Sequence, residues 1–110
     1  MEKNDDNRGR LKYPKFDRPI LKMDGANYEI IDLSISGVKF KGNVNLKLKP
    51  SDEYFVEIIT MSDQPIQTKA RYVRRVGDLF ALTFTKHLPE KLIKKEEERI
   101  KKKFGDATLD

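Results

Sequence analysis

The residues best suited to chemistry or ligand binding lie in a short polar run from Asp32 to Val38, DLSISGV, with Arg8 and Arg10 before it in the chain. An aspartate can accept hydrogen bonds from the N1 and N2 donors of guanine, and an arginine can pair bidentately with a phosphate or with guanine O6 and N7. Gly37 permits a tight turn and lets a flat base approach the backbone. The pattern predicts side-chain binding of a nucleotide, or alternatively a strand end closed by an Asx or Ser turn.

Other kinds of chemistry have little support in the sequence. The chain has no cysteine, and its one histidine, His87, has no visible partner, so a surface or capping role is expected. The acidic residues are mostly interleaved with lysine, and none has metal-ligand spacing. Gly37 and Gly42 stand alone, so no glycine-rich phosphate loop is predicted. We therefore expect no catalytic residue, no metal site and no enzyme activity.

Length and charge narrow the class of protein further. The chain of 110 residues fits one domain, which excludes a two-domain enzyme with a deep cleft between the domains. With 23 basic and 18 acidic residues it carries a net charge of +5. Basic clusters lie in residues 8–18 and 69–75, and they favour an anionic partner: a nucleotide, a nucleic acid or a membrane surface. No membrane span or signal peptide is visible, so a cytoplasmic location is expected.

The elements that position the polar run are predicted to be strands. Short apolar runs separated by turn residues follow Pro19, and an Asp24-Gly25 pair between two of them is a strong hairpin signal. The expected strands are 20–23, 28–36, 38–40, 44–48, 54–59, 65–75 and 79–84. This spacing is typical of an antiparallel barrel or sandwich. We predict a flexible basic arm over 1–18, a β-barrel over 19–86, and a helix and tail over 87–110.

Strand periodicity makes two local predictions. In 31–35, alternation places Ile31, Leu33 and Ile35 on one face and places Asp32 and Ser34 together on the other. In 54–59, both faces are largely apolar, which favours cover on both sides, for example by a helix.

Residues 89–104 predict that helix. Pro89 suits the first helical position, and no breaker follows before Gly105. Ile93, Ile100 and Phe104 form one narrow apolar stripe, so the helix is expected on the barrel surface. The alternating Glu and Lys residues are read as a solvated face.

Residues 32–40, DLSISGVKF, resemble the second signature of the PilZ domain, an Asp or Asn, x, Ser, x, x, Gly followed by alternating apolar residues. The resemblance extends through the arm, the hairpin after Pro19, the later strands and the charged terminal helix. It implies a mostly β fold, a six-stranded antiparallel PilZ-like β-barrel with a C-terminal α-helix. It also implies binding of cyclic di-GMP without catalysis.

The first PilZ signature, Arg-x-x-x-Arg, is incomplete in this chain. Arg10 matches the second arginine by its spacing from Asp32, but Asp6 stands where the first would be. Arg8 is close enough to substitute for it; an alternative alignment pairs Arg8 with Lys12, and Lys15 is a third choice.

The resemblance implies a non-catalytic cyclic di-GMP receptor or adaptor of bacterial signalling that acts by contacting an effector protein. The expected ligand-binding residues are Arg8, Arg10, Asp32, Ser34 and Gly37. The alternative is a PilZ-like adaptor that has lost ligand binding and works through protein contacts alone. A third interpretation, a nucleic-acid-binding barrel, rests on charge alone, because no row of exposed aromatic residues is evident.

Overall fold

The computed structural model describes residues 10–43 and 45–104, which form seven strands and one helix. The strands are β1 (Leu11–Lys12), β2 (Ile20–Met23), β3 (Ala26–Leu33), β4 (Gly37–Lys41), β5 (Glu53–Ile59), β6 (Ile66–Val76) and β7 (Leu79–Phe84). The helix is α2 (Glu90–Phe104).

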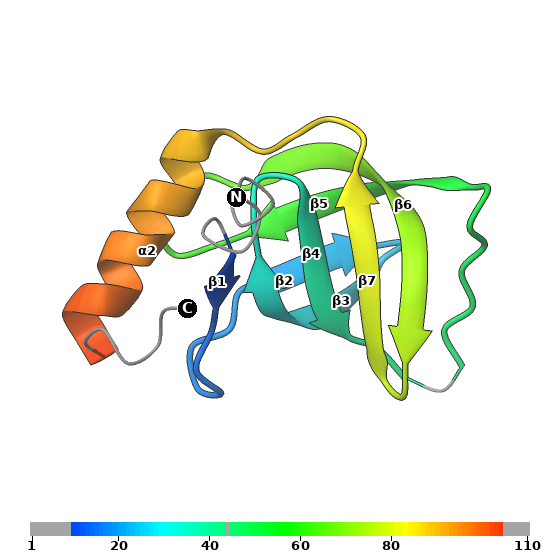
Figure 1. Cartoon of the computed structure of the whole chain (residues 1–110), viewed down its shortest axis with the longest axis horizontal. Helices are drawn as coiled ribbons and strands as arrows, with labels where there is room; N and C mark the ends of the chain where they lie inside the picture. The colour runs from blue at the N-terminus through cyan, green and yellow to red at the C-terminus, as the bar shows by residue number, and fades with distance from the viewer. Residues whose placement is uncertain (1–9, 44, 105–110) are drawn as a thin grey trace, which may run out of the picture.

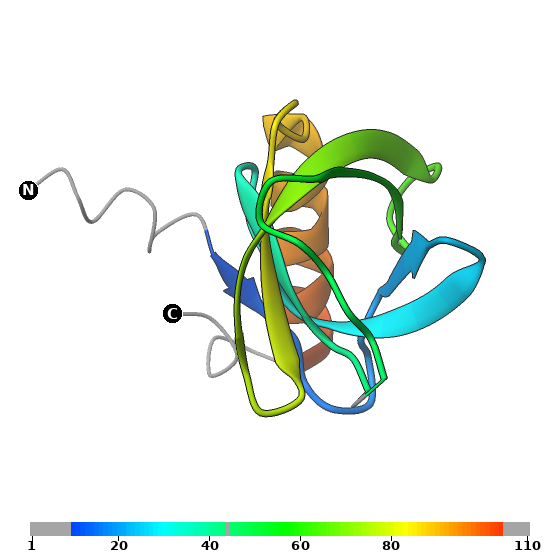
Figure 2. The ribbon, with the colours of Figure 1, turned by 90° about the vertical axis from the view of Figure 1, so that its right-hand side faces the viewer.

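Six of these strands close into an antiparallel barrel. In the order β3, β2, β5, β6, β7, β4, each strand pairs with the next, and β4 pairs back with β3. The short strand β1 adds to β3, with Leu11 opposite Leu33 and Lys12 opposite Asp32. In Figure 1, α2 lies beside one end of the barrel, and in Figure 2 it crosses behind the strands. The predicted six-stranded barrel with a C-terminal helix is confirmed.

The barrel encloses one apolar core. Its centre holds two stacked rings, Phe40 and Phe80, with centroids 5.5 Å apart, and Tyr28 and Tyr72 pack against them. The buried apolar residues are Leu11, Tyr13, Leu21, Met23, Ile30, Leu33, Val38, Phe40, Val56, Ile58, Ala70, Phe80, Leu82, Phe84, Leu88, Leu92, Ile93 and Ile100. Strands and helix therefore share a single core.

The predicted hairpin at Asp24-Gly25 is confirmed. Both residues have positive φ, 52° and 80°, and they connect β2 to β3 where Met23 pairs with Ala26. Positive φ at both central positions is the geometry that matches the twist of the flanking strands.

The predicted strand at 44–48 is wrong for the residues described there. Residues 45–48 are not in a strand, because the chain turns at Asn43, whose carbonyl and side-chain oxygens accept hydrogen bonds from the Leu46 and Asn45 N–H groups. Leu46 and Leu48 still pack against the core from outside the sheet.

A β-bulge in β3 changes the predicted alternation. The register with β4 shifts between Ile30 and Asp32, so Ile30 and Leu33 both face the core and are fully buried. Ile35, predicted to share a face with Leu33, lies beyond the end of β3 in the turn before β4 and is 37% exposed. An extra residue in one strand alters which side chains point inward after it. The prediction of one shared apolar face was therefore wrong.

The two faces of β5 are also unlike the prediction. Val56 and Ile58 are buried in the core, as the alternation indicated. Phe55 on the other face is 72% exposed, and the Lys69 ammonium lies over its ring, 5.3 Å from the centroid. The helix covers an end of the barrel and leaves this face open.

Part of the predicted arm belongs to the folded domain. Residues 1–9, with Arg8, lie outside the described residues. From Leu11 onward the chain packs on the barrel: Leu11 and Tyr13 are buried, and the Tyr13 N–H donates to the Ile31 carbonyl at 3.0 Å. Burial of these two large side chains offsets the entropy cost of ordering a segment that was predicted to be flexible. The boundary of the barrel unit at residue 19 therefore excludes residues that contribute to its core.

The helix has the predicted extent, but its buried face contains a charge. Ile93 and Ile100 are buried as the stripe requires, and Leu92 is buried beside them, whereas Phe104 is 38% exposed. Glu96 lies between them with no exposed surface, although its position in a Glu and Lys run indicated a solvated residue.

Glu96 is the centre of a polar cluster that attaches α2 to two loops. Its carboxylate accepts hydrogen bonds from the Tyr13 hydroxyl at 2.7 Å, from the Ser62 hydroxyl, and from Arg99 Nε and Nη2 at 3.0 and 3.2 Å. Arg99 also donates to Asp17 at 2.8 Å. We call these five residues the Glu96 cluster.

The protonation equilibria reflect this environment. Burial alone would raise the pKa of Glu96, but the hydrogen bonds from Arg99, Ser62 and Tyr13 outweigh it and hold the pKa below its usual value. Burial, reinforced by the Glu96 charge, raises the pKa of Tyr13 far above its ordinary value. The cluster is therefore a charged glutamate held by neutral and cationic donors.

Candidate functional site

A hollow of about 210 Å³ lies on the outer face of the barrel and gathers most of the predicted site residues. Arg10, Asp32, Ser34 and Gly37 all line it. The other lining residues are Ser36, Val38, Lys39, Val73, Arg74, Ala81, Leu82 and Thr83. Arg8 is the one predicted site residue outside the described part of the chain.

Strand register explains why these side chains meet. Lys12 of β1 lies opposite Asp32 of β3, which lies opposite Lys39 of β4. Lys39 in turn lies opposite Ala81 of β7, and Ala81 lies opposite Arg74 of β6. Residues directly opposite one another in adjacent strands share a face of the sheet. One row therefore crosses five strands and carries basic groups at both ends.

Asp32 is the acidic centre of this site. It is only 5% exposed, with Arg10 Nε 4.0 Å from its Oδ1 and Lys39 Nζ 3.8 Å from its Oδ2. Both separations exceed the 2.7–3.2 Å typical of N–H···O hydrogen bonds, so these cations attract the carboxylate without a short bond. Arg10, Lys39 and Arg74 outnumber Asp32 among the charged lining residues, which favours an anionic ligand.

Ser34 closes the turn between β3 and β4. Its hydroxyl oxygen accepts from the Gly37 N–H at 3.1 Å and the Ser36 N–H at 3.3 Å, while its own N–H donates to the Gly37 carbonyl at 2.9 Å. The Ser-turn alternative is therefore realised here. The hydroxyl donates its own proton to the Gly37 carbonyl over a long 3.5 Å contact, which a ligand atom can replace, so a turn role and a ligand contact are compatible.

Gly37 is required by the neighbouring strand. A Cβ at this position would lie 2.9 Å from the carbonyl oxygen of Leu82 on β7, closer than side chains tolerate. The backbone of β4 thus approaches β7 closely, and the absence of a side chain also leaves the wall of the hollow flat. Close packing of β4 against β7 is therefore a reason for glycine at position 37 that the sequence alone did not reveal.

The turn that holds Ser34 and Gly37 is itself anchored. The Ser36 carbonyl accepts from the Phe84 N–H at 2.8 Å and from the Thr83 hydroxyl at 3.2 Å. The Ile35 carbonyl accepts from the Leu88 N–H at 2.9 Å. These contacts fix the wall of the hollow before any ligand binds.

Arg74 and Lys39 are lining residues that sequence reasoning did not assign to the site. The basic cluster at 69–75 was noted only as an anion-attracting patch. A bulge in β6, where the register with β7 shifts between Tyr72 and Arg74, places Arg74 opposite Ala81 and beside the hollow. A bulge position cannot be read from alternation, so the charge was visible and its placement was not.

Metal binding and histidine chemistry have no support in this part of the molecule. Among residues 10–43 and 45–104, no three acidic or histidine side chains are grouped to hold a metal ion. His87 is exposed between β7 and α2, as expected for a surface histidine.

The fold and this basic hollow define a small β-barrel domain suited to an anionic ligand. The chain belongs to the PilZ domain family, whose model matches residues 8–101. PilZ domains are typically non-catalytic binding domains.

The fold is also similar to a solved structure, the crystal structure of the Legionella uncharacterized protein Lpg0364. The two chains are 16% identical, with a TM-score of 0.62, and the similarity covers 86% of this chain and 95% of that one. At this identity the likeness shows the fold alone. The comparison with curated proteins gives no match. No helix in the described part of the chain combines the length and apolar character that crossing a membrane requires.

Proposed function

We propose that this protein is a non-catalytic cyclic di-GMP receptor that acts in bacterial signalling through contacts with an effector protein. The observation that carries the proposal is that Arg10, Asp32, Ser34 and Gly37, from both PilZ signatures, line one basic hollow. We further propose a cytoplasmic location, because a bacterial second messenger is present in the cytoplasm.

Each group has a role that its chemistry suits. Asp32 accepts hydrogen bonds from the N1 and N2 donors of one guanine, and Arg10 pairs with a phosphate or with guanine O6 and N7. The Ser34 hydroxyl turns its proton from the Gly37 carbonyl to a polar atom of the ligand. Gly37 and Ala81, without bulky side chains, let a flat base lie against the barrel wall.

The size of the hollow fits part of the ligand. Pockets that enclose a whole small molecule measure about 300–1,000 Å³, whereas this hollow measures about 210 Å³. We infer that one guanine and its phosphate occupy it and that the remainder of the dinucleotide lies over the surface. Arg8 remains a proposed contact of that remainder.

Arg74 compensates in part for the incomplete first signature. Asp6 stands in place of the first arginine, and one lost charged hydrogen bond costs about 1.5–3 kcal/mol of binding free energy. Arg74 brings a guanidinium to the same hollow from β6. A guanidinium can bind a phosphate through two hydrogen bonds, which an ammonium cannot match in geometry. Arg74 is therefore a better substitute than Lys39 for the missing first arginine.

Isothermal titration calorimetry with cyclic di-GMP tests the proposal. Binding is expected, with a clear preference over cyclic di-AMP, because adenine lacks the N1 and N2 donor pair for Asp32. Asp32→Ala should weaken binding at least tenfold while the circular dichroism spectrum stays unchanged. Equal affinity for the two dinucleotides would contradict the assigned role of Asp32.

The alternative is an adaptor that has lost cyclic di-GMP binding and works through protein contacts alone. The incomplete first signature favours it, since Asp6 stands at the position where the signature has an arginine. The absence of any heat or saturable shift at millimolar cyclic di-GMP would make this the better account. Broad, strongly salt-dependent binding to unrelated DNA or RNA would instead favour the nucleic-acid interpretation.

A further inference from the structure

Three large apolar side chains are exposed where two loops meet the end of α2. Phe16 is 91% exposed, Met61 76% and Phe104 38%. They come from the β1–β2 connection, the β5–β6 connection and the last residue of α2. Single exposed apolar residues are ordinary, but convergence from three separate segments marks an interaction surface.

Two basic residues of α2, Arg99 and Lys103, contact all three segments. Arg99 Nη1 lies 3.9 Å from Met61 Sδ and 2.8 Å from an oxygen of Asp17, the residue after Phe16. Lys103 Nζ lies 3.4 Å from the same Asp17 oxygen and 5.5 Å from the centre of the Phe104 ring. Arg99 of α2 therefore contacts both loops, and Asp17 holds the β1–β2 connection against the helix.

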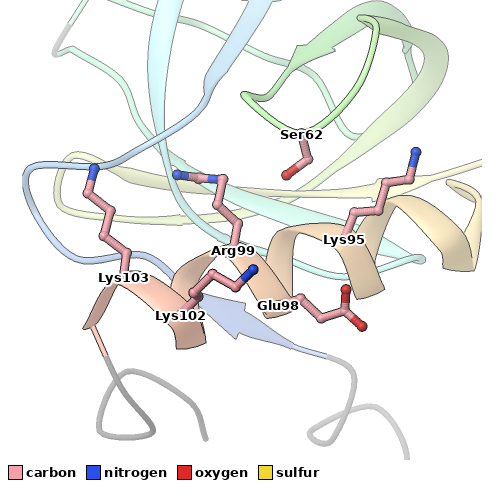
Figure 3. Close-up of a pocket in the computed structure, with 6 residues that line it drawn as sticks. All are labelled: Ser62, Lys95, Glu98, Arg99, Lys102 and Lys103. Carbon is pink, nitrogen blue, oxygen red and sulfur yellow. The ribbon is translucent and has the colours of Figure 1, made fainter.

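A hollow of about 480 Å³ lies on the same surface. Its lining residues are Ser62, Lys95, Glu98, Arg99, Lys102 and Lys103, and Figure 3 shows Ser62 facing the helix that carries the others. We call this hollow, together with Phe16, Met61 and Phe104, the α2 surface.

The α2 surface presents positive charge to solvent. Its hollow is lined by four basic residues and one acidic residue, Glu98, and Asp63 of the β5–β6 connection pairs with Lys95 at 3.0 Å. Two of the carboxylates that balance these cations, Asp17 and Glu96, are buried beneath them, whereas the Lys103 side chain is 58% exposed. The charges of this surface balance when Asp63 and the two buried carboxylates are counted, so the positive charge that reaches solvent comes mainly from Lys102 and Lys103.

We propose that the α2 surface docks an acidic segment of a partner protein. An apolar side chain of that segment packs on Met61 and on the aliphatic stems of the lysines that line the hollow, and a flanking Asp or Glu pairs with Lys102. A concave site suits a protruding peptide side chain better than a flat bilayer, and the net charge of +5 opposes pairing with a second copy of this chain. This proposal goes beyond nucleotide binding and does not depend on it.

Site-specific photocrosslinking in the native cells tests the proposal with the full chain. Met61→p-benzoylphenylalanine and Phe16→p-benzoylphenylalanine place the probe on the α2 surface. Phe55→p-benzoylphenylalanine is the control, since Phe55 is 72% exposed on an outer face of the barrel. Mass spectrometry should find one protein segment rich in Asp and Glu joined to both α2-surface probes and not to the control. Adducts to a second copy, to lipid or to a segment without excess acid would overturn the proposal, as would labelling no stronger than the control.

A matched pair of charge reversals then tests the contacts. Binding of the crosslinked segment, made as a synthetic peptide, should weaken at least tenfold in Lys102→Glu. Lys94→Glu makes the same change in net charge at an exposed position of α2 outside the hollow, and binding should change less than twofold. Met61→Ala should also weaken binding while the melting temperature stays the same. Equal losses in the two charge reversals would show that overall charge, not this surface, binds the peptide.

Discussion

Replacing Glu96 by alanine should destabilise the fold by about 3 kcal/mol, because it removes the acceptor at the centre of the Glu96 cluster. The carboxylate is fully buried and receives hydrogen bonds from Tyr13, Ser62 and Arg99. Removing one partner of a buried ion pair typically costs about 3–5 kcal/mol, since the remaining charge loses its compensation.

The expected value lies at the low end of that range. Arg99 keeps its bond to Asp17 at 2.8 Å, and its side chain is 20% exposed, so its charge remains paired and partly solvated. The Tyr13 hydroxyl, in a residue only 6% exposed, loses Glu96 as its acceptor, which by itself costs about 1–3 kcal/mol. Together these effects give about 3 kcal/mol, or a fall of roughly 12 °C in Tm at about 4 °C per kcal/mol.

Urea unfolding followed by circular dichroism measures the effect. Glu96→Gln retains an acceptor and the side-chain volume, so it should lose about half as much stability. Glu98→Ala removes an exposed glutamate from the same helix and should change stability by less than about 0.5 kcal/mol. A loss below about 1 kcal/mol in Glu96→Ala, or equal losses in the alanine and glutamine variants, would refute the reasoning.

Three further predictions concern acid stability, the turn and the site. Because the pKa of Glu96 is lowered in the folded state, its ionised form adds to the free energy of unfolding above the unfolded pKa, about 4.3, and this contribution is lost as pH falls through the folded pKa. As pH is lowered below about 4.3, the urea midpoint should therefore fall less steeply in Glu96→Gln than in the parent protein. Parallel curves would contradict this. Gly37→Ala should cost about 1–3 kcal/mol of unfolding free energy even without ligand, because its Cβ meets the Leu82 carbonyl, and a neutral result would place the need for glycine elsewhere. In calorimetric titration, Arg74→Ala should weaken cyclic di-GMP about tenfold, whereas Arg75→Ala, outside the hollow, should not; equal effects would remove Arg74 from the site.

The fold could be predicted from the sequence because its signals are local. Apolar runs, turn residues and the hairpin at Asp24-Gly25 each fix a short stretch, and the helix follows from Pro89 and an unbroken run of helix formers. The bulges in β3 and β6 could not be predicted this way. Whether a strand takes an extra residue depends on how it pairs with its neighbour, and the periodicity of one segment carries no information about that pairing.

The candidate site was predictable only where motif and position coincide. Asp32, Ser34 and Gly37 are adjacent in sequence and meet in space because one turn holds them. Arg74 reaches the same hollow through a strand register, and its charge alone did not assign it to the site. Glu96 shows the opposite case, since its neighbours Lys95 and Glu97 suggest a solvated residue and only the packing of Tyr13 and Ser62 reveals a buried one.

Strand β1 gives the two proposed binding surfaces a common structural element. Arg10 directly precedes this strand and lines the hollow proposed to bind cyclic di-GMP. Lys12 lies opposite Asp32, another lining residue of that hollow. The next residue, Tyr13, instead donates to Glu96 on α2, because successive side chains of a strand point to opposite faces. A ligand that pulled Arg10 toward Asp32 would therefore act on the same short segment that holds α2 against the barrel. A ligand shifts the equilibrium between two conformations only if its contacts differ between them. A change in the contacts of β1 on ligand binding is therefore the route by which the nucleotide would alter the α2 surface.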